Sequence, residues 1–452
     1  MTSTTNSDNK TLIKSALRMA WPSVIESFFV SLVGLMDSLM VSNLGAYAVA
    51  AVGLTTQPKF IGLALFFAIN IAVSALVAWR KGENNRRGAN QIFLTALCFS
   101  IVASLVIGAL FVVLAGQFMY WAGAEADTHD TATIYLRIVM GGIIFQVISM
   151  VINAAQRGSG FTRISMRTNL TSGALNIVFN YLLINGNLGF PAWGVRGAAI
   201  GTVISSTVAC GMSVHSLFGK DSFVQVGYLW QERIKPAVES GKQLVKFAYA
   251  TFIEQLLLRF GFLMVALLVA NLGTKAFAVQ QVGMNIMGLS FAFGDGMQIA
   301  AVSLIGQSLG RGQPEVARRY GRICQRLGGC ISLILATLYL LGGHWFYSLY
   351  FDEFELIDTG VQIMNLMTVI VLMQIAQVIY MGCLRGAGDV KVTVLISLIG
   401  VTMVRPLTSY AFAYTLGLGI IGIWLGVICD QFVRMALSYW RFKSGKWMKI
   451  KL

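Results

Sequence analysis

Carboxylates inside apolar stretches are the residues of this sequence best suited to chemistry. Glu26 and Asp37 lie in the run from Trp21 to Gly53, and Glu254 lies in a second run that begins at Tyr249. Glu26 and Asp37 are eleven residues apart, which on a helix places them on nearly the same face, about 16 Å apart along the axis. A charge at mid-membrane costs at least about 2.5–3.5 kcal/mol, so these residues are candidates for binding a proton or another cation. For Glu26 and Glu254, a structural pair is the alternative.

Polar side chains in neighbouring apolar stretches can assist these carboxylates. Asn176 and Asn180 lie one helical turn apart, and Thr202 lies in the next apolar stretch. They can solvate a proton carrier or complete an oxygen cage around a small cation. Hydrogen bonds between helices would account for the same residues equally well.

Further charges lie in apolar stretches of the second half. Arg259, Asp295 and Arg405 are expected to form a buried cluster in which opposite charges keep one another ionised. The cluster would either hold helices together or form a gate beside the substrate cavity. Asp430 and Arg434 stand four residues apart, so an intrahelical ion pair explains them and no function is assigned to them.

Membrane-spanning helices must position these residues. Of the 452 residues, 56% are hydrophobic and only 12% are charged, and the mean hydropathy is +0.71. An apolar run of about 20 residues crosses a hydrocarbon layer about 30 Å thick. We predict an all-α polytopic membrane protein with twelve spans near 16–41, 50–78, 92–115, 133–156, 164–186, 195–217, 244–270, 277–305, 322–343, 361–383, 392–416 and 421–441.

The two halves of the sequence repeat one another at a constant distance along the chain. Glu26 corresponds to Glu254, Asn43-Leu44-Gly45 to Asn271-Leu272-Gly273, and Arg157-Gly158 to Arg385-Gly386. We call the distance from Glu26 to Glu254 the repeat spacing, and its regularity indicates a duplication. Each repeat holds six spans, an even number, so both begin on the same side of the membrane. We predict an N-terminal lobe over 1–217, a cytoplasmic linker over 218–243 and a C-terminal lobe over 244–452, with a pocket between the lobes.

The distribution of basic residues predicts the orientation. The net charge is +15, and Lys and Arg gather in alternate connections, whereas the connections between them carry almost only Arg196 and Lys275 as cations. This pattern places both termini in the cytoplasm and does not indicate nucleic-acid binding. The six cysteines lack the clustered spacing of a metal site and are expected to be packing residues.

Motifs of several other protein classes are missing from the sequence. There is no G-x-x-x-x-G-K-[ST], no H-E-x-x-H and no nucleophile elbow. ATP bound by a Walker motif is therefore excluded as a direct energy source. Carboxylates in duplicated spans instead indicate a secondary transporter driven by an ion gradient, not an enzyme.

Several motifs carry a resemblance to a known family. They are the opening WP…GLMDSLMVSNLG…AAVGL, the loop GQSLGRGQP followed by ARRYGR, and CLRGAGD at the tenth span. With its two six-span repeats, the chain resembles the multidrug and toxic compound extrusion (MATE) family from about Leu12 to Lys443. The resemblance implies a V-shaped, two-lobed antiporter that exports organic, often cationic, amphipathic compounds in exchange for H+ or Na+.

The resemblance also implies roles for individual residues. Asp37 matches the first-span acid used in cation coupling across the family, and Glu254 matches the seventh-span acid of the bacterial quinolone-exporter and eukaryotic branches. Asn176, Asn180 and Thr202 match the N-lobe site of the archaeal and DNA-damage-inducible type, with Asn180 in place of Asp.

The tenth span departs from the quinolone-exporter pattern. Gln374 stands where that branch has Asp, so a C-lobe Na+ site of that composition is expected to be incomplete.

The resulting prediction is multidrug efflux by alternating access. An external cation binds Asp37 or Glu254, with Glu26 assisting, and shifts the two lobes. The coupling ion is H+ or Na+, no cofactor is expected, and the partners are small organic molecules and the lipid bilayer. We expect a monomer in the plasma membrane.

Two alternatives remain, the first within transport and the second from another class. A flippase for a lipid-linked precursor would be favoured by a deep cationic groove and extra spans. A membrane-embedded prenyl-transfer enzyme would need paired Asp-rich motifs, and no D-D-x-x-D occurs.

Overall fold

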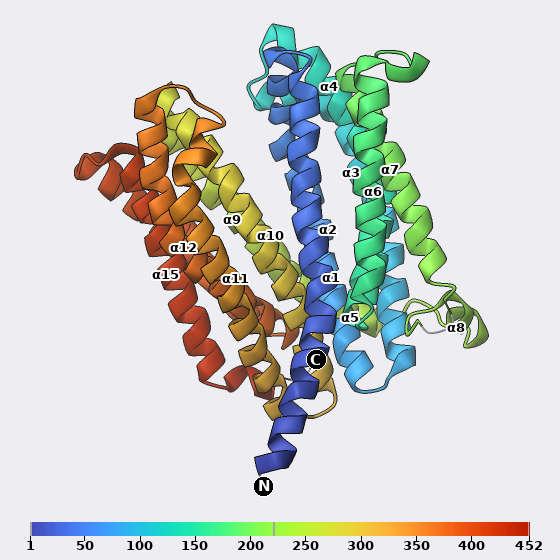
Figure 1. Ribbon diagram of the computed structural model, residues 1–452. Coiled ribbons are helices and arrows are strands. Elements are labelled where there is room, and N and C mark those ends of the chain that lie inside the picture. The colour runs from blue at the N-terminus through green and yellow to red at the C-terminus, as the bar shows by residue number, and fades with distance from the viewer. Residues whose placement is uncertain (1, 220–221, 451) are drawn as a thin grey trace. The chain divides into compact units, whose positions relative to one another are not determined.

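The part of the protein that the structure describes is built of helices (Figure 1). The computed structural model describes residues 2–219, 222–450 and 452, and this part of the chain contains no strand. Ten helices are long and apolar enough to cross a membrane, and the bent pair α4 and α5 forms an eleventh candidate span. The fold class predicted from the sequence is confirmed.

The chain divides into two compact units. The N-terminal unit comprises Phe28–Tyr249, and the C-terminal unit comprises Met1–Ser27 together with Ala250–Leu452. The long helices α1 (Thr2–Ser42) and α9 (Val238–Ala270) each contribute to both units.

The N-terminal unit contains long helices and two short helical turns. They are α2 (Ala46–Gly82), α3 (Arg86–Trp121), α4 (Ala126–Gly141), α5 (Ile143–Gly158), α6 (Thr162–Asn185), η1 (Asn187–Gly189), α7 (Val195–Ser216) and α8 (Val226–Gln231). The helix α6 corresponds to the predicted span 164–186. Its 24 residues extend about 36 Å, and polar residues such as Asn176 and Asn180 lower its hydropathy.

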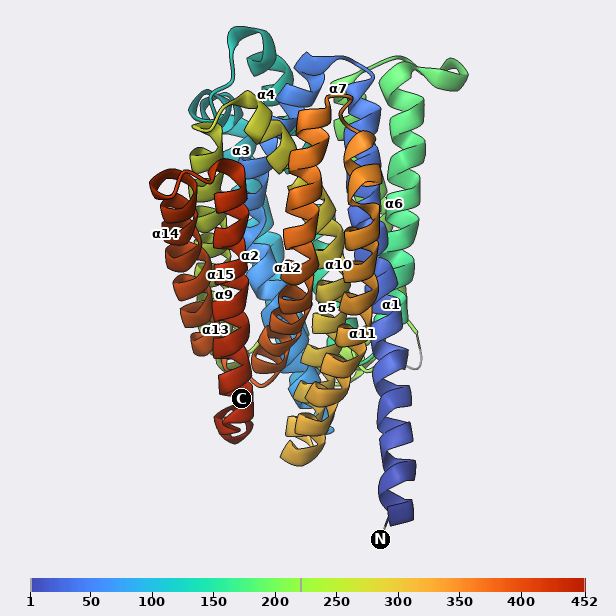
Figure 2. The ribbon, with the colours of Figure 1, turned by 60° about the vertical axis from the view of Figure 1, so that its left-hand side comes forward.

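The C-terminal unit also consists of long helices and short helical segments. It contains α10 (Thr274–Gly310), α11 (Pro314–Ser348), α12 (Phe354–Gly386), α13 (Val390–Ser397), η2 (Leu398–Val404), α14 (Arg405–Tyr410), η3 (Ala411–Thr415), α15 (Gly419–Lys443) and η4 (Lys446–Lys449). The elements from α13 to η3 form one span, Val390–Thr415. The first turns of α1 and the last residue, Leu452, lie toward the same end of this unit (Figures 1 and 2).

The duplication extends to backbone conformation. Gly45 and Gly273, which precede α2 and α10, have φ of 107° and 102°, a region that favours glycine. A Cβ on Gly158 would lie 2.4 Å from the carbonyl oxygen of Ser74, and a Cβ on Gly386 would lie 2.6 Å from that of Val302. Ser74 and Val302 are themselves related by the repeat spacing, so both units use the same close helix crossing.

Two of the spans are irregular. Helices α4 and α5 meet at Gly142 with a bend of 46°, where a Cβ would lie 2.6 Å from Cγ1 of Val203 on α7. In the span that contains Pro406, π-helical turns η2 and η3 lie on either side of α14. Proline cannot donate the helical hydrogen bond at its own nitrogen, and insertions of this kind are a recognised way for a helix to absorb that loss.

Candidate cation-coupling site

Helices α1, α6 and α7 bring a row of polar side chains together inside the N-terminal unit. Asn180 Nδ2 donates to Asp37 Oδ1 at 2.5 Å and to Asn176 Oδ1 at 3.3 Å. Asn176 Nδ2 donates to Thr202 Oγ1 at 3.3 Å, and Thr202 Oγ1 donates to the carbonyl of Ala198 at 3.0 Å. The structure therefore joins all four residues that the sequence grouped here into one hydrogen-bonded row that ends at Asp37.

Close packing of α6 on α7 sets the position of Asn180. A Cβ on Gly201 would lie 2.7 Å from Asn180 Oδ1, so the glycine makes room for the carboxamide. Asn180 is 0% exposed, and its Oδ1 has no hydrogen-bond partner in the described part of the chain. A buried acceptor without a partner costs about 1–3 kcal/mol. Asn180 is thus an available acceptor next to a carboxylate.

Two further side chains belong to this site. Lys59 on α2 and Asp37 are electrostatic partners, and the buried phenol of Tyr135 on α4 interacts with both Asp37 and Thr202. Asp37 is only partly buried. The sequence shows Lys59 as a charge within a span, but nothing in it distinguishes Tyr135 from other aromatic residues.

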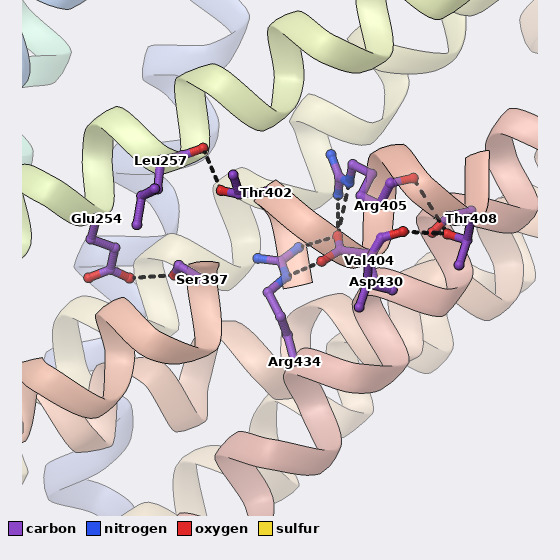
Figure 3. Close-up of polar contacts among 10 residues, drawn as sticks. Glu254, Leu257, Ser397, Thr402, Val404, Arg405, Thr408, Asp430 and Arg434 are labelled. Atoms are coloured by element: carbon purple, nitrogen blue, oxygen red, sulfur yellow. Dashed lines mark hydrogen bonds and ion pairs between the residues drawn. The ribbon is translucent and has the colours of Figure 1, made fainter. Parts of the chain in front are cut away.

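Glu254, in the C-terminal unit, has a different environment. Its Oε1 accepts hydrogen bonds from Arg385 Nη2 at 2.7 Å and from Ser397 Oγ at 2.9 Å, and its Oε2 accepts one from Thr393 Oγ1 at 3.1 Å. Figure 3 shows the bond from Ser397. The carboxylate side chain is 0% exposed. Both of its oxygens are therefore occupied and shielded.

The surroundings of Arg385 are repeated in the N-terminal unit. Arg385 Nη1 donates to Gln298 Oε1 at 2.9 Å. Arg157, its counterpart in the first repeat, donates to Asn70 Oδ1 at 3.1 Å and to Ser165 Oγ at 3.3 Å. The repeat spacing also relates Asn70 to Gln298 and Ser165 to Thr393. The repeated Arg-Gly motif was the sequence signal that could have identified Arg385 as a network residue.

The row at Asp37 is not repeated. The counterpart of Asp37 in the second repeat is Val265, which lies in an apolar cluster with Val269 and Ala413. The position corresponding to Asn176 is Val404. Among the residues that the structure describes, this arrangement is therefore confined to the N-terminal unit.

Arg405 was expected to pair with Asp295 in a cluster that also includes Arg259, but its carboxylate partner in the structure is Asp430. Arg405 Nε and Nη2 donate to Asp430 Oδ2 at 2.9 and 2.6 Å (Figure 3). The predicted intrahelical pair is present, with Arg434 Nε 2.8 Å from Asp430 Oδ1. The sequence does not show which helices are neighbours, and here α15 packs directly on the span that carries Arg405.

The remaining candidates are dispersed. Asp295 is exposed and has Arg385 as its electrostatic partner, while Arg259 is partly buried. Glu26 is 3% exposed. Gln374 is 1% exposed, and neither atom of its amide has a hydrogen-bond partner among the described residues.

Within residues 2–219, 222–450 and 452, no group of three or more His, Cys, Asp or Glu side chains is arranged to hold a metal ion.

Comparisons with known proteins agree with the duplicated fold. The MatE family model matches the chain twice, over residues 22–182 and 250–411. The chain is 25% identical over 436 residues to a probable multidrug resistance protein NorM of Thermotoga maritima, covering 96% of this chain and 93% of that protein. It is 25% identical over 437 residues to the uncharacterized transporter YisQ of Bacillus subtilis, with 96% and 95% covered.

Solved structures share the fold. An outward-facing multidrug resistance MATE family transporter of the MOP superfamily superposes with a TM-score of 0.89, at 21% identity over 96% of this chain and 97% of that one. A MOP superfamily transporter from Pyrococcus furiosus gives 0.87, at 22% identity over 96% and 95%. The two family matches, one in each repeat, show that this chain belongs to the MatE family of membrane transporters.

Proposed function

We propose that this protein is an antiporter that exports organic, often cationic, compounds in exchange for protons, and that Asp37 is the residue that binds and releases the proton. The hydrogen-bonded row Asp37–Asn180–Asn176–Thr202 is the observation that carries the proposal. Relatives such as the probable multidrug resistance protein of Thermotoga maritima support the class of substrate.

The donor set favours a proton over Na+. The row contains a single carboxylate, and an amide N–H of Asn180 points at it from 2.5 Å. Na+ would need several oxygen ligands, so the amide of Asn180 would have to rotate before its oxygen could join Asp37 in coordination. A proton needs only one carboxylate oxygen. Asn180 donates to Oδ1 of Asp37 and not to Oδ2, so a proton can bind at Oδ2.

Coupling follows from the charge on Asp37. An ionised Asp37 attracts a cationic substrate, whereas a protonated Asp37 has no charge to hold it. Exchange requires that proton and substrate favour different conformations, because a ligand with equal affinity for both conformations shifts neither. We propose that alternating access provides these conformations.

We assign Glu254 a structural role. Its two oxygens accept three hydrogen bonds, one of them from Arg385 in an ion pair with an N–O distance of 2.7 Å. Arg157 makes related contacts in the other unit. This repetition supports a network that was present before the duplication and that holds helices together. Glu26 occupies the matching position of the first repeat, and we propose that it supports the fold in the same way.

The remaining parts of the proposal concern the cell. Basic connections on one side of the membrane support an orientation with both termini in the cytoplasm, and we propose the plasma membrane as its location. We propose that it works as a monomer and needs no cofactor other than the coupling ion.

The test is transport of a fluorescent cationic dye by purified protein in lipid vesicles, with pH and Na+ gradients imposed separately. A pH gradient should drive dye movement, and Asp37→Asn should reduce it to the level of protein-free vesicles. Asp352→Asn, at an exposed position, is the matched control and should transport normally. Dye transport driven only by Na+ would refute the choice of ion, and full activity of folded Asp37→Asn would refute the site.

A further inference from the structure

The end of α15 and the residues that follow it form a strongly basic surface. Residues 441–449, here called the basic segment, carry several cations and no acidic residue. The cations are Arg441, Lys443, Lys446 and Lys449. The candidate membrane span Gly419–Lys443 ends inside this segment. The basic segment therefore lies where the chain leaves the hydrocarbon layer, at the depth of the lipid headgroups.

Aromatic side chains in the last turns of α15 indicate the same depth. Tyr439 and Trp440 are 46% and 66% exposed, and exposed Tyr and Trp side chains gather at the interface between membrane and water. Lys443 Nζ lies 5.8 Å from the centroid of the Tyr439 ring. A lysine in this position can extend its ammonium group to the level of the lipid phosphates.

Trp447 fixes the basic segment against the helices of the C-terminal unit. Its side chain is 0% exposed, its ring stacks on that of Phe442 with centroids 5.1 Å apart, and its Nε1 donates to the carbonyl of Phe442 at 2.8 Å. Phe442 in turn packs against α11, where a Cβ on Gly321 would lie 2.5 Å from the Phe442 ring. The basic segment is thus held in one position by its own aromatic residues.

The helical turn η4 directs two lysines the same way. Side chains three residues apart on a 3₁₀ helix are eclipsed, so Lys446 and Lys449 share one face of η4. Trp447 lies between them and is buried, whereas both lysines are exposed. The turn therefore buries an indole and presents two ammonium groups on its outer face.

The charges of the basic segment are mostly unbalanced. Arg441 Nε pairs with Asp389 Oδ2 at 2.6 Å. Lys443, Lys446 and Lys449 are exposed and form no ion pair with any residue that the structure describes. Because each Lys or Arg near a membrane surface attracts anionic lipids, three unbalanced lysines at one place favour a negatively charged headgroup.

We propose that the basic segment is a binding surface for anionic phospholipids, with Lys443, Lys446 and Lys449 contacting the phosphate groups of the adjoining leaflet. Clusters of Lys and Arg that follow a membrane span directly are typical of such surfaces. A zwitterionic lipid would bring no net charge to balance the lysines. The surface lies outside the site proposed for proton coupling at Asp37.

Native mass spectrometry of the purified protein in detergent tests the proposal. The protein is titrated with phosphatidylglycerol or with phosphatidylcholine of the same acyl chains, and phosphatidylglycerol should bind more tightly. Each lysine should contribute about fivefold to this affinity, so the triple variant Lys443→Gln/Lys446→Gln/Lys449→Gln should bind phosphatidylglycerol roughly a hundredfold more weakly. Equal affinity for the two lipids, or wild-type affinity of the triple variant, would overturn the proposal.

A matched control removes the same charge from another part of the chain. Arg233→Gln/Lys235→Gln/Lys242→Gln changes three exposed cations in a stretch where Glu232 and Glu239 partly balance the charge. This variant should bind phosphatidylglycerol as tightly as the wild type. An equal loss in both triple variants would show that the total charge attracts the lipid, and the assignment to the basic segment would be wrong.

Two further measurements define the ligand and the geometry. Excess soluble glycerol 3-phosphate should leave phosphatidylglycerol bound, whereas its displacement would identify a free phosphate as the ligand and refute a lipid surface. Trp447→Ala keeps the three lysines but removes the contacts that hold η4, so it should also weaken binding of phosphatidylglycerol. Wild-type affinity of Trp447→Ala would refute a surface held in place by Trp447.

Discussion

The ion pair of Glu254 with Arg385 allows a structural role to be separated from a role in coupling. The perturbation is a pair of variants, Glu254→Gln alone and Glu254→Gln together with Arg385→Met. If Glu254 fastens helices, the single variant should be unstable and the double variant should recover both stability and proton-driven transport. If Glu254 exchanges the coupling ion, no change at Arg385 can restore transport.

The structure sets the size of the effect. The side chains of Glu254 and Arg385 are 0% and 8% exposed, so the single variant leaves a buried guanidinium without its ion-pair partner, and the exposed Asp295 remains as its electrostatic partner. Breaking a buried pair in this way costs about 3–5 kcal/mol, or roughly a hundredfold to a few thousandfold in the folding equilibrium. The double variant removes both charges and should cost only about 1–2 kcal/mol, for the weakened hydrogen bonds of Gln298, Thr393 and Ser397.

The assay combines unfolding and transport on the same preparations. Unfolding is followed in mixed micelles of increasing SDS content, and dye transport is measured in vesicles with equal amounts of folded protein. Glu353→Gln is the matched control, because Glu353 and its partner Lys275 are 60% and 63% exposed and such pairs contribute at most about 1 kcal/mol. A double variant that is stable but inactive, or a single variant as stable as the control, would refute the reasoning.

Two further predictions concern packing and buried charge. Asp430→Asn should lower the free energy of unfolding by about 3–5 kcal/mol, since Arg405 and Arg434 share this one carboxylate. Unfolding of the variant at the same SDS content as the wild type would contradict this prediction. Gly197→Ala should cost about 1–3 kcal/mol, because its Cβ would lie 2.2 Å from the carbonyl oxygen of Leu183, whereas Gly211→Ala on the same helix meets nothing within 4 Å. Equal melting temperatures for the two alanine variants would show that α7 moves away at no cost.

Properties of local composition and spacing were readable in the sequence. Apolar runs predicted the helical membrane fold, and the constant repeat spacing predicted a duplication that appears again in the φ angles of Gly45 and Gly273. Asp37, Asn176, Asn180 and Thr202 were also grouped from the sequence and its family resemblance. These inferences succeed because hydropathy and repeat spacing depend only on the order of residues along the chain.

The spacing along the chain predicted the pair of Asp430 with Arg434, but the tertiary structure decided which charges pair between helices. Arg405 binds Asp430, and Glu254 is held by Arg385 at the end of a different helix. Each pairing depends on which helices are neighbours, how closely they approach and how each is rotated about its axis. Gly400 is an example of such a close approach. A Cβ at this position would lie 2.7 Å from Asp430 Oδ1 and 2.3 Å from Arg434 Cγ. The approach of α15 to η2 depends on this small residue, and no pattern of charges along the sequence reveals it.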